Sequence, residues 1–145
     1  KNDKYFPDYV VILQPTSPLR NEKDIDKSIE KFKRNKRADC LVSVQNVPHN
    51  FEPFSQMKLN KKGFLENIIK QKHIKTRKQE KKITLARNGA AIYIIRKKNF
   101  NKFILGGNIL PYNMPMIKSL DIDNKEDLML CRLIFRNLKN YENQL

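Results

Sequence analysis

The strongest constraint on how this chain can fold is segment 8–20, Asp-Tyr-Val-Val-Ile-Leu-Gln-Pro-Thr-Ser-Pro-Leu-Arg, in which an apolar strand runs directly into a loop. Residues 10–13 are continuously apolar and mostly β-branched, which is typical of a strand buried on both faces of a parallel sheet. Pro15 and Pro18 remove backbone donors and fix φ, so the loop is stiff. Ligands of open α/β sheets bind outside the carboxyl ends of the strands. We therefore predict that this loop is one wall of a binding site; the alternative is an ordinary strand-to-helix turn.

A helix and a second strand are predicted next. Asn21 can cap a helix, and Asp24, three positions further on, completes a box-like start. Apolar residues then recur at helical spacing, and the helix is predicted to end near Asn35. Residues 40–44 predict a short apolar strand, parallel to the first because a helix connects the two. Together these segments form a strand–helix–strand unit.

The remaining segments complete a layered α/β sheet. Residues 57–65 predict a hairpin with Gly63 at its turn, and 90–95 predict another buried strand. Residues 120–122 predict a last strand. Asn124 is expected to cap a final helix whose apolar side chains cover the sheet. The order of helices and strands predicts the α/β class.

Composition limits the possible partners and compartment. The chain has 145 residues, one-domain size, with a formal net charge of +15 and a basic stretch between residues 58 and 82. This charge fits a nucleic-acid surface, a lysine-rich solvated surface or attraction of a polyanionic small substrate. The stretch has few aromatic residues for base stacking, which makes nucleic acid unlikely. No apolar run of transmembrane length and no signal-peptide core is present, so we expect no membrane and a cytoplasmic location for a chain whose two cysteines are reduced.

The segment Ser-Leu-Asp-Ile-Asp at 119–123 carries two candidate metal ligands. Residues two apart on a strand project to the same face, so Asp121 and Asp123 are predicted to point together. Two carboxylates are the hard oxygen ligands that Mg²⁺ takes when it also binds substrate phosphates. The alternative is that Asp123 only helps to cap the following helix while Asp121 is solvated.

Two further segments offer polar groups to a ligand. The predicted strand at 90–95 is preceded by Arg87, Asn88 and Gly89. Arg87 offers guanidinium donors, Asn88 offers an amide, and Gly89 permits close approach of the backbone to a ligand. Arg77 and its neighbours supply cations suited to a substrate carboxylate. Each signal is weak alone, since Asn-Gly is commonly a turn and a charged run is commonly solvated.

Taken in order, these segments resemble the acylneuraminate cytidylyltransferases, also called CMP-sialic acid synthetases. The resemblance covers nearly the whole chain, including a basic Arg-Lys-Gln-Glu segment at 77–80. The motifs that carry it are Gln-Pro-Thr-Ser-Pro-Leu-Arg at 14–20, Ala-Asp-Cys-Leu-Val-Ser-Val at 38–44, Arg-Asn-Gly-Ala-Ala-Ile-Tyr at 87–93 and Ser-Leu-Asp-Ile-Asp-Asn-Lys-Glu-Asp-Leu at 119–128.

The resemblance implies a Rossmann-like nucleotidyltransferase sheet that transfers CMP from CTP to a nonulosonic acid and releases pyrophosphate. It implies that Asp121 and Asp123 are catalytic and hold Mg²⁺. The substrate-binding residues that it implies are Gln14, Thr16, Ser17, Arg20, Arg77, Gln79, Arg87, Asn88 and Gly89. Which nonulosonic acid is used stays open.

The resemblance also implies a homodimer or higher homo-oligomer, with residues 46–82 as an arm of the single domain 1–145 that reaches over the partner's site. The family's N-terminal strand and its basic, glycine-containing nucleotide loop do not appear before residue 10. We therefore expect an incomplete sheet, and whether this fragment is active on its own stays open. The alternative functions are a nucleotidyltransferase for another sugar acid, a non-catalytic sugar-nucleotide binding or assembly module, and, least favoured, a nucleic-acid binder.

Overall fold

The computed structural model describes residues 6–69, 83–87 and 91–142, and it divides the chain into two compact units. One unit comprises Lys1–Gln45 with Arg87–Leu145, and the other comprises Asn46–Ala86. The first unit contains a mixed sheet and two α-helices, so the predicted α/β class is confirmed. The assignment of 46–82 as a dimerisation arm stays a prediction.

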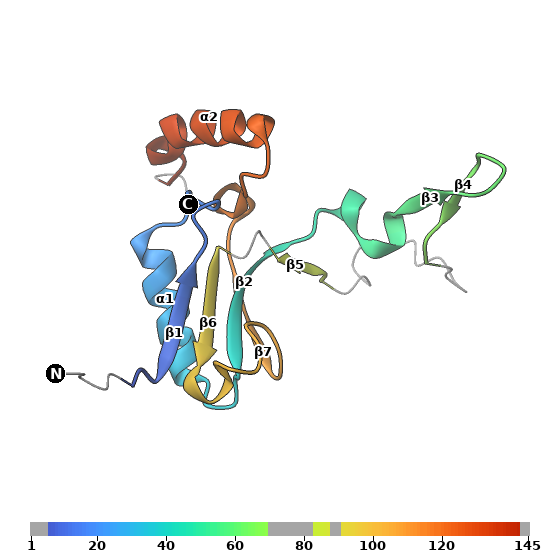
Figure 1. Cartoon of the computed structure of the whole chain (residues 1–145). Helices are drawn as coiled ribbons and strands as arrows, with labels where there is room; N and C mark the ends of the chain where they lie inside the picture. The colour runs from blue at the N-terminus through green and yellow to red at the C-terminus, as the bar shows by residue number, and fades with distance from the viewer. Residues whose placement is uncertain (1–5, 70–82, 88–90, 143–145) are drawn as a thin grey trace. The chain divides into compact units, whose positions relative to one another are not determined.

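One α-helix follows the first strand and the other ends the described chain, and the remaining strands are joined by loops and short 3₁₀ turns (Figure 1). In chain order they are β1 (Tyr9–Leu13), α1 (Glu22–Arg34), β2 (Cys40–Asn46), η1 (His49–Phe51), η2 (Pro53–Ser55), β3 (Met57–Leu59), β4 (Leu65–Asn67), β5 (Leu85–Arg87), β6 (Ile92–Arg96), η4 (Lys97–Asn99), β7 (Ile109–Asn113), η5 (Met116–Ser119) and α2 (Lys125–Glu142).

The larger sheet has the strand path β1–β6–β2–β5, with β7 also pairing with β2. β6 runs antiparallel to both β1 and β2, whereas β7 is parallel to β2. β1 and β2 therefore run in the same direction, as predicted, but β6 lies between them. The prediction that residues 10–13 form a strand of a parallel sheet is wrong, because a later segment of the chain inserts antiparallel between the two early strands.

The burial of β1 also differs from the prediction. Val10, Val11 and Ile12 are only half-buried and Leu13 is exposed. Among the described residues β1 is the terminal strand of the sheet, paired along its whole length with β6 from Tyr9↔Arg96 to Leu13↔Ile92. The buried central strand is β2, with residues 40–44 all buried.

Helix α1 packs against β6 and β7 and supplies the largest core side chain, Phe32 (Figure 1). Its predicted start is confirmed, because Asn21 Oδ1 accepts the Asp24 N–H and Asp24 Oδ2 accepts the Asn21 N–H, each at 3.0 Å. Its predicted end is also confirmed, with Asn35 as the C-terminal cap. Two orphan donors at the helix start are thus satisfied within four residues.

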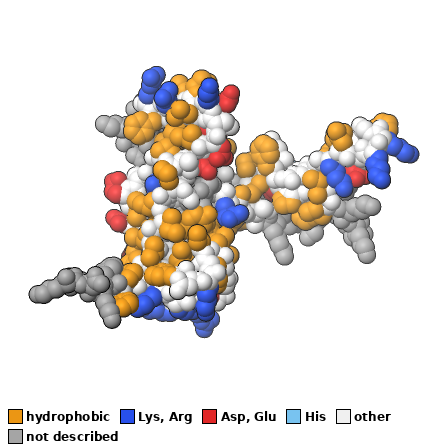
Figure 2. Space-filling view, in the orientation of Figure 1, with side chains coloured by type: hydrophobic (Ala, Val, Ile, Leu, Met, Phe, Trp, Pro, Cys, Tyr) orange, Lys and Arg blue, Asp and Glu red, His pale blue; other side chains and the backbone are white. Residues whose placement is uncertain are grey.

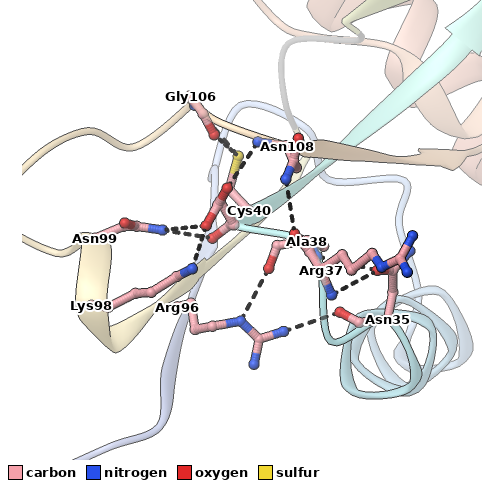
Figure 3. A network of polar contacts seen from close by, with 10 residues as sticks. Asn35, Arg37, Ala38, Cys40, Arg96, Lys98, Asn99, Gly106 and Asn108 are labelled. Carbon is pink, nitrogen blue, oxygen red and sulfur yellow. Dashed lines mark hydrogen bonds and ion pairs between the residues drawn. The ribbon is translucent and has the colours of Figure 1, made fainter.

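A polar network around Asp39 fixes the start of β2 (Figure 3). Asp39 Oδ2 accepts the Asn108 N–H at 3.0 Å, and Oδ1 lies 2.7 Å from Lys98 Nζ and 3.3 Å from Asn99 Nδ2. A Cβ at Gly107, where φ is +64°, would lie 2.5 Å from Asp39 Oδ2, so glycine permits this close approach. The Asn108 amide, followed by Lys98 and Asn99, lowers the pKa of Asp39 from 3.8 to about 2.

This low pKa gives a prediction about acid stability. A carboxylate whose pKa falls on folding contributes stability above its unfolded pKa and loses it as the pH falls through the folded pKa. Asp39→Asn should therefore lower the free energy of unfolding at pH 7, with the difference from wild type shrinking between about pH 4 and pH 2. Urea unfolding across this pH range measures it. Asp26→Asn, on the exposed face of α1, is the control, and an Asp39→Asn deficit that does not change with pH contradicts the prediction.

The second unit contains the predicted hairpin. β3 and β4 pair antiparallel from Met57↔Asn67 to Leu59↔Leu65, and Gly63 at the turn has φ +80°. Many apolar side chains of this unit are exposed, including Phe64 at 68% (Figure 2). Such an apolar surface is typical of an interaction site.

Helix α2 begins where predicted but does not cover the sheet. Its side chains Met129 and Phe135 are 64% and 67% exposed, while Cys131 is buried. α1 makes the helix–sheet contacts instead, so this part of the prediction is wrong. The spacing of apolar residues predicts an apolar face on α2, but this spacing alone does not identify which part of the protein that face contacts. None of the helices in the described part of the chain combines the length and apolarity needed to cross a membrane.

Candidate functional site

The Arg20 side chain bonds to backbone carbonyls of the loop after β1, to which it belongs. Arg20 Nη1 donates to the Gln14 carbonyl at 2.5 Å and to the Ser17 carbonyl at 2.6 Å, and the Ser17 N–H donates to Gln14 O at 3.3 Å. Partial burial lowers the pKa of the Arg20 guanidinium. The two prolines and this internal guanidinium together give a loop with one defined backbone path.

The second half of the site is the segment 119–123, which forms a loop. The predicted strand at 120–122 is wrong: the chain makes the turn η5 and then continues without a ladder partner to the start of α2. In place of strand pairing the segment makes one backbone hydrogen bond, from the Ile122 N–H to the Thr16 carbonyl at 2.8 Å. The 119–123 loop thus lies directly against the loop that follows β1.

A side-chain contact joins the same two loops. Ser17 is fully buried, and its hydroxyl donates to Asp121 Oδ1 at 3.1 Å. These residues are 104 positions apart in the sequence. The structure therefore brings together two of the predicted segments, and Ser17 contributes by orienting the Asp121 carboxylate.

Neither Asp121 nor Asp123 is used to cap α2. The cap is formed by Asn124, whose Oδ1 accepts the Asp127 N–H at 2.9 Å, while Asp127 Oδ2 accepts the N–H groups of Asp123 and Asn124. Asp121 is half-buried and Asp123 is exposed. The part of the alternative interpretation in which the Asp123 side chain caps α2 is therefore wrong.

Asp121 and Asp123 carry hard oxygen donors of the kind that a divalent cation takes, but the strand on which they were predicted to share a face does not form. Among the described residues, Asp121 Oδ2 and the Asp123 carboxylate accept no hydrogen bond, so these oxygens are available to a ligand. Within the same residues, no set of three or more His, Cys, Asp or Glu side chains gathers to hold a metal. Two carboxylates with water and phosphate oxygens are a donor set that suits Mg²⁺.

A buried ion pair lies between α1 and the turn η5. Asp24 Oδ2 is 3.4 Å from Lys118 Nζ, and each residue is 8% exposed. Burial, followed by the Asp24 charge, raises the pKa of Tyr112. Sequence reasoning gave Asp24 only a capping role and did not identify Lys118, because nothing in a lysine beside a serine indicates that its ammonium group is buried.

The other predicted residues divide into two groups. Gln14 is half-buried, Thr16 is exposed, and Arg87 is exposed at the end of β5. The remaining four residues lie outside the described residues: Arg77, Gln79, Asn88 and Gly89. The described part of the site therefore consists of the 14–20 loop and the 119–123 loop.

A hollow of about 620 Å³ lies elsewhere in the first unit, over the C-terminal half of α1. Its lining is mainly basic and consists of Lys27, Glu30, Lys31, Arg34, Asn35, Lys36, Arg37 and Leu110. Lysine and arginine at this end of a helix also complement the helix dipole, so this surface does not need a ligand to explain it.

Comparison of the sequence with models of protein families and with curated proteins found no match.

Proposed function

We propose that this chain carries the sugar-acid and metal side of a cytidylyltransferase site, which transfers CMP from CTP to a nonulosonic acid and releases pyrophosphate. The observation that carries the proposal is the hydrogen bond from the Ser17 hydroxyl to Asp121. It joins a proline-stiffened loop at a strand end to a loop with two carboxylates, and these are two of the four motifs of the resemblance. The proposal includes a Rossmann-like nucleotidyltransferase sheet and a cytoplasmic location; the free thiols Cys40 and Cys131 support the latter.

The chemistry that this proposal needs is mostly positioning. A sugar hydroxyl attacks the α-phosphorus of CTP in line, the bond from that phosphorus to the bridging oxygen breaks, and pyrophosphate leaves. Asp121 and Asp123 would hold Mg²⁺, which when bound supplies neutralisation of the negative charge on the triphosphate. Ser17 orients Asp121, and Arg20 keeps the loop that carries Ser17 in one conformation. The positive charge of the chain attracts the polyanionic nucleotide.

The partner that we propose is a second copy of the chain. Apolar side chains of Asn46–Ala86 are exposed along both strands of the hairpin, from Met57 at 48% to Leu65 at 63%. Covering such a surface in a homodimer removes apolar area from water, which stabilises the assembly by about 25 cal/mol per Å². This fits the role of an arm at a partner's site.

Two measurements on the same preparation test the proposed function. The first is pyrophosphate release with CTP, Mg²⁺ and a panel of nonulosonic acids. The second is calorimetric binding of the CMP-nonulosonate product with and without Mg²⁺. Release that requires both the sugar acid and Mg²⁺ supports the enzyme. Mg²⁺-dependent binding without release supports the non-catalytic binding module, and a folded chain that does neither contradicts the proposal.

A further inference from the structure

The buried pair Asp24–Lys118 joins the first turn of α1, which follows the 14–20 loop, to the turn η5, which leads into the 119–123 loop. We propose that this pair is a positioning device, which fixes the turn η5 against the start of α1 and so sets where the Asp121 carboxylate lies. The inference deepens the proposed function and depends on it only for the identity of the ligand.

One carboxylate oxygen of Asp24, in α1, contacts both the residue after the 14–20 loop and the turn η5. Asp24 Oδ2 accepts the N–H of Asn21 at 3.0 Å and faces Lys118 Nζ at 3.4 Å. Asn21 is the residue at which the 14–20 loop ends and α1 begins. The end of the first loop and the turn before the second loop are therefore held by the same carboxylate.

The connection from this pair to Asp121 is short and internally bonded. Within the turn, the Lys118 N–H and the Ser119 hydroxyl both donate to the Pro115 carbonyl, at 3.0 and 2.9 Å. Only Ser119 and Leu120 separate Lys118 from Asp121, and the Ile122 N–H then bonds to the loop after β1. The 119–123 loop is thus anchored at its start by the ion pair and at its middle by the Thr16 carbonyl.

Each partner of the Asp24–Lys118 pair is about nine-tenths buried, and a buried charge is costly unless it is paired and hydrogen-bonded. Two apolar side chains would fill the same space without that cost, but they would not define the position of the turn along α1. Burial of these two charges is favourable only while they stay in contact, so the pair favours the placement of η5 that keeps Lys118 against Asp24. Outer residues that orient metal ligands commonly change metal affinity by about 10–100-fold when substituted.

The test compares local and global opening by amide hydrogen exchange. The variants are Lys118→Met, Asp24→Asn and the two together, the last of which removes both charges of the pair. The Ile122 amide reports the contact between the two loops, and the Ile94 amide in β6 reports global opening. Lys31→Met is the matched control, because the Lys31 ammonium donates to the Pro111 carbonyl away from both loops.

The expected result is a selective effect. In the double variant, exchange at Ile122 should speed by about tenfold or more relative to Ile94, and the Mg²⁺ dissociation constant should rise by about tenfold. Lys118→Arg should keep most of the Ile122 protection that Lys118→Met loses. Lys31→Met should match wild type in both Ile122 exchange and Mg²⁺ affinity. Equal loss of protection at Ile122 and Ile94, or no change at Ile122, overturns the inference and leaves the pair a purely structural feature.

The two proposals fail in different ways. A wild-type chain that neither binds Mg²⁺ nor releases pyrophosphate, but whose double variant loses Ile122 protection selectively, contradicts the proposed function and supports the positioning pair. A wild-type chain that binds Mg²⁺, with a double variant that keeps the affinity and the Ile122 protection, contradicts the positioning pair and supports the metal site.

Discussion

Alanine at both Asp121 and Asp123 should reduce Mg²⁺-dependent turnover by more than about 100-fold while the chain stays folded. The magnitude follows because metal-assisted charge neutralisation is worth several kcal/mol and each 1.4 kcal/mol is tenfold in rate. The fold should persist because α2 is capped by Asn124 and Asp127, so neither alanine removes a capping group. Pyrophosphate release measures the first part, and denaturant unfolding measures the second.

Two further variants make this test specific. Asp26→Ala removes an exposed carboxylate from α1 and should leave turnover unchanged. Ser17→Ala keeps both carboxylates but removes the donor to Asp121, so it should weaken the Mg²⁺ dependence by less than the double alanine variant. Turnover that survives the loss of both carboxylates at ordinary Mg²⁺ concentrations excludes these residues as metal ligands.

Phe32→Ala should lower the free energy of unfolding by about 3–5 kcal/mol, the range for deleting a buried aromatic side chain. Phe32 is fully buried in the core cluster between α1 and the sheet. Its ring also lies 4.6 Å from the Arg96 guanidinium carbon and meets Tyr9 edge-on, with ring centroids 6.2 Å apart. The variant therefore loses apolar burial, a cation–π contact and an aromatic contact together.

The measurement is the urea midpoint at constant slope, since a change of midpoint without a change of slope reports stability. Phe64→Ala is the control, because Phe64 is 68% exposed in the second unit and its truncation should change stability by less than about 0.5 kcal/mol. A Phe32→Ala variant as stable as the control would show that α1 does not hold the core as described.

The sequence predicted the features that depend on neighbours a few residues apart. The capping box of Asn21 and Asp24 is complete within four residues, and the hairpin turn needs a positive φ that Gly63 supplies. The run at residues 40–44 is fully buried as its apolar pattern predicts. In each case residues close together in the sequence meet the physical requirement, so the sequence alone predicts the feature. The requirements are a partner for an unpaired donor, a positive φ and a run of apolar side chains.

Only the tertiary structure decided which segments meet. An apolar run at residues 10–13 shows that a strand forms, but its partner is chosen by long-range pairing, and β6 meets it antiparallel. The 119–123 segment has the polar–apolar alternation of a strand, yet it forms a loop whose backbone hydrogen bond runs from the Ile122 N–H to the Thr16 carbonyl. The contacts of Ser17 with Asp121 and of Asp24 with Lys118 join positions 104 and 94 residues apart. The buried groups in them, Ser17, Asp24 and Lys118, need these partners only because folding has removed them from water.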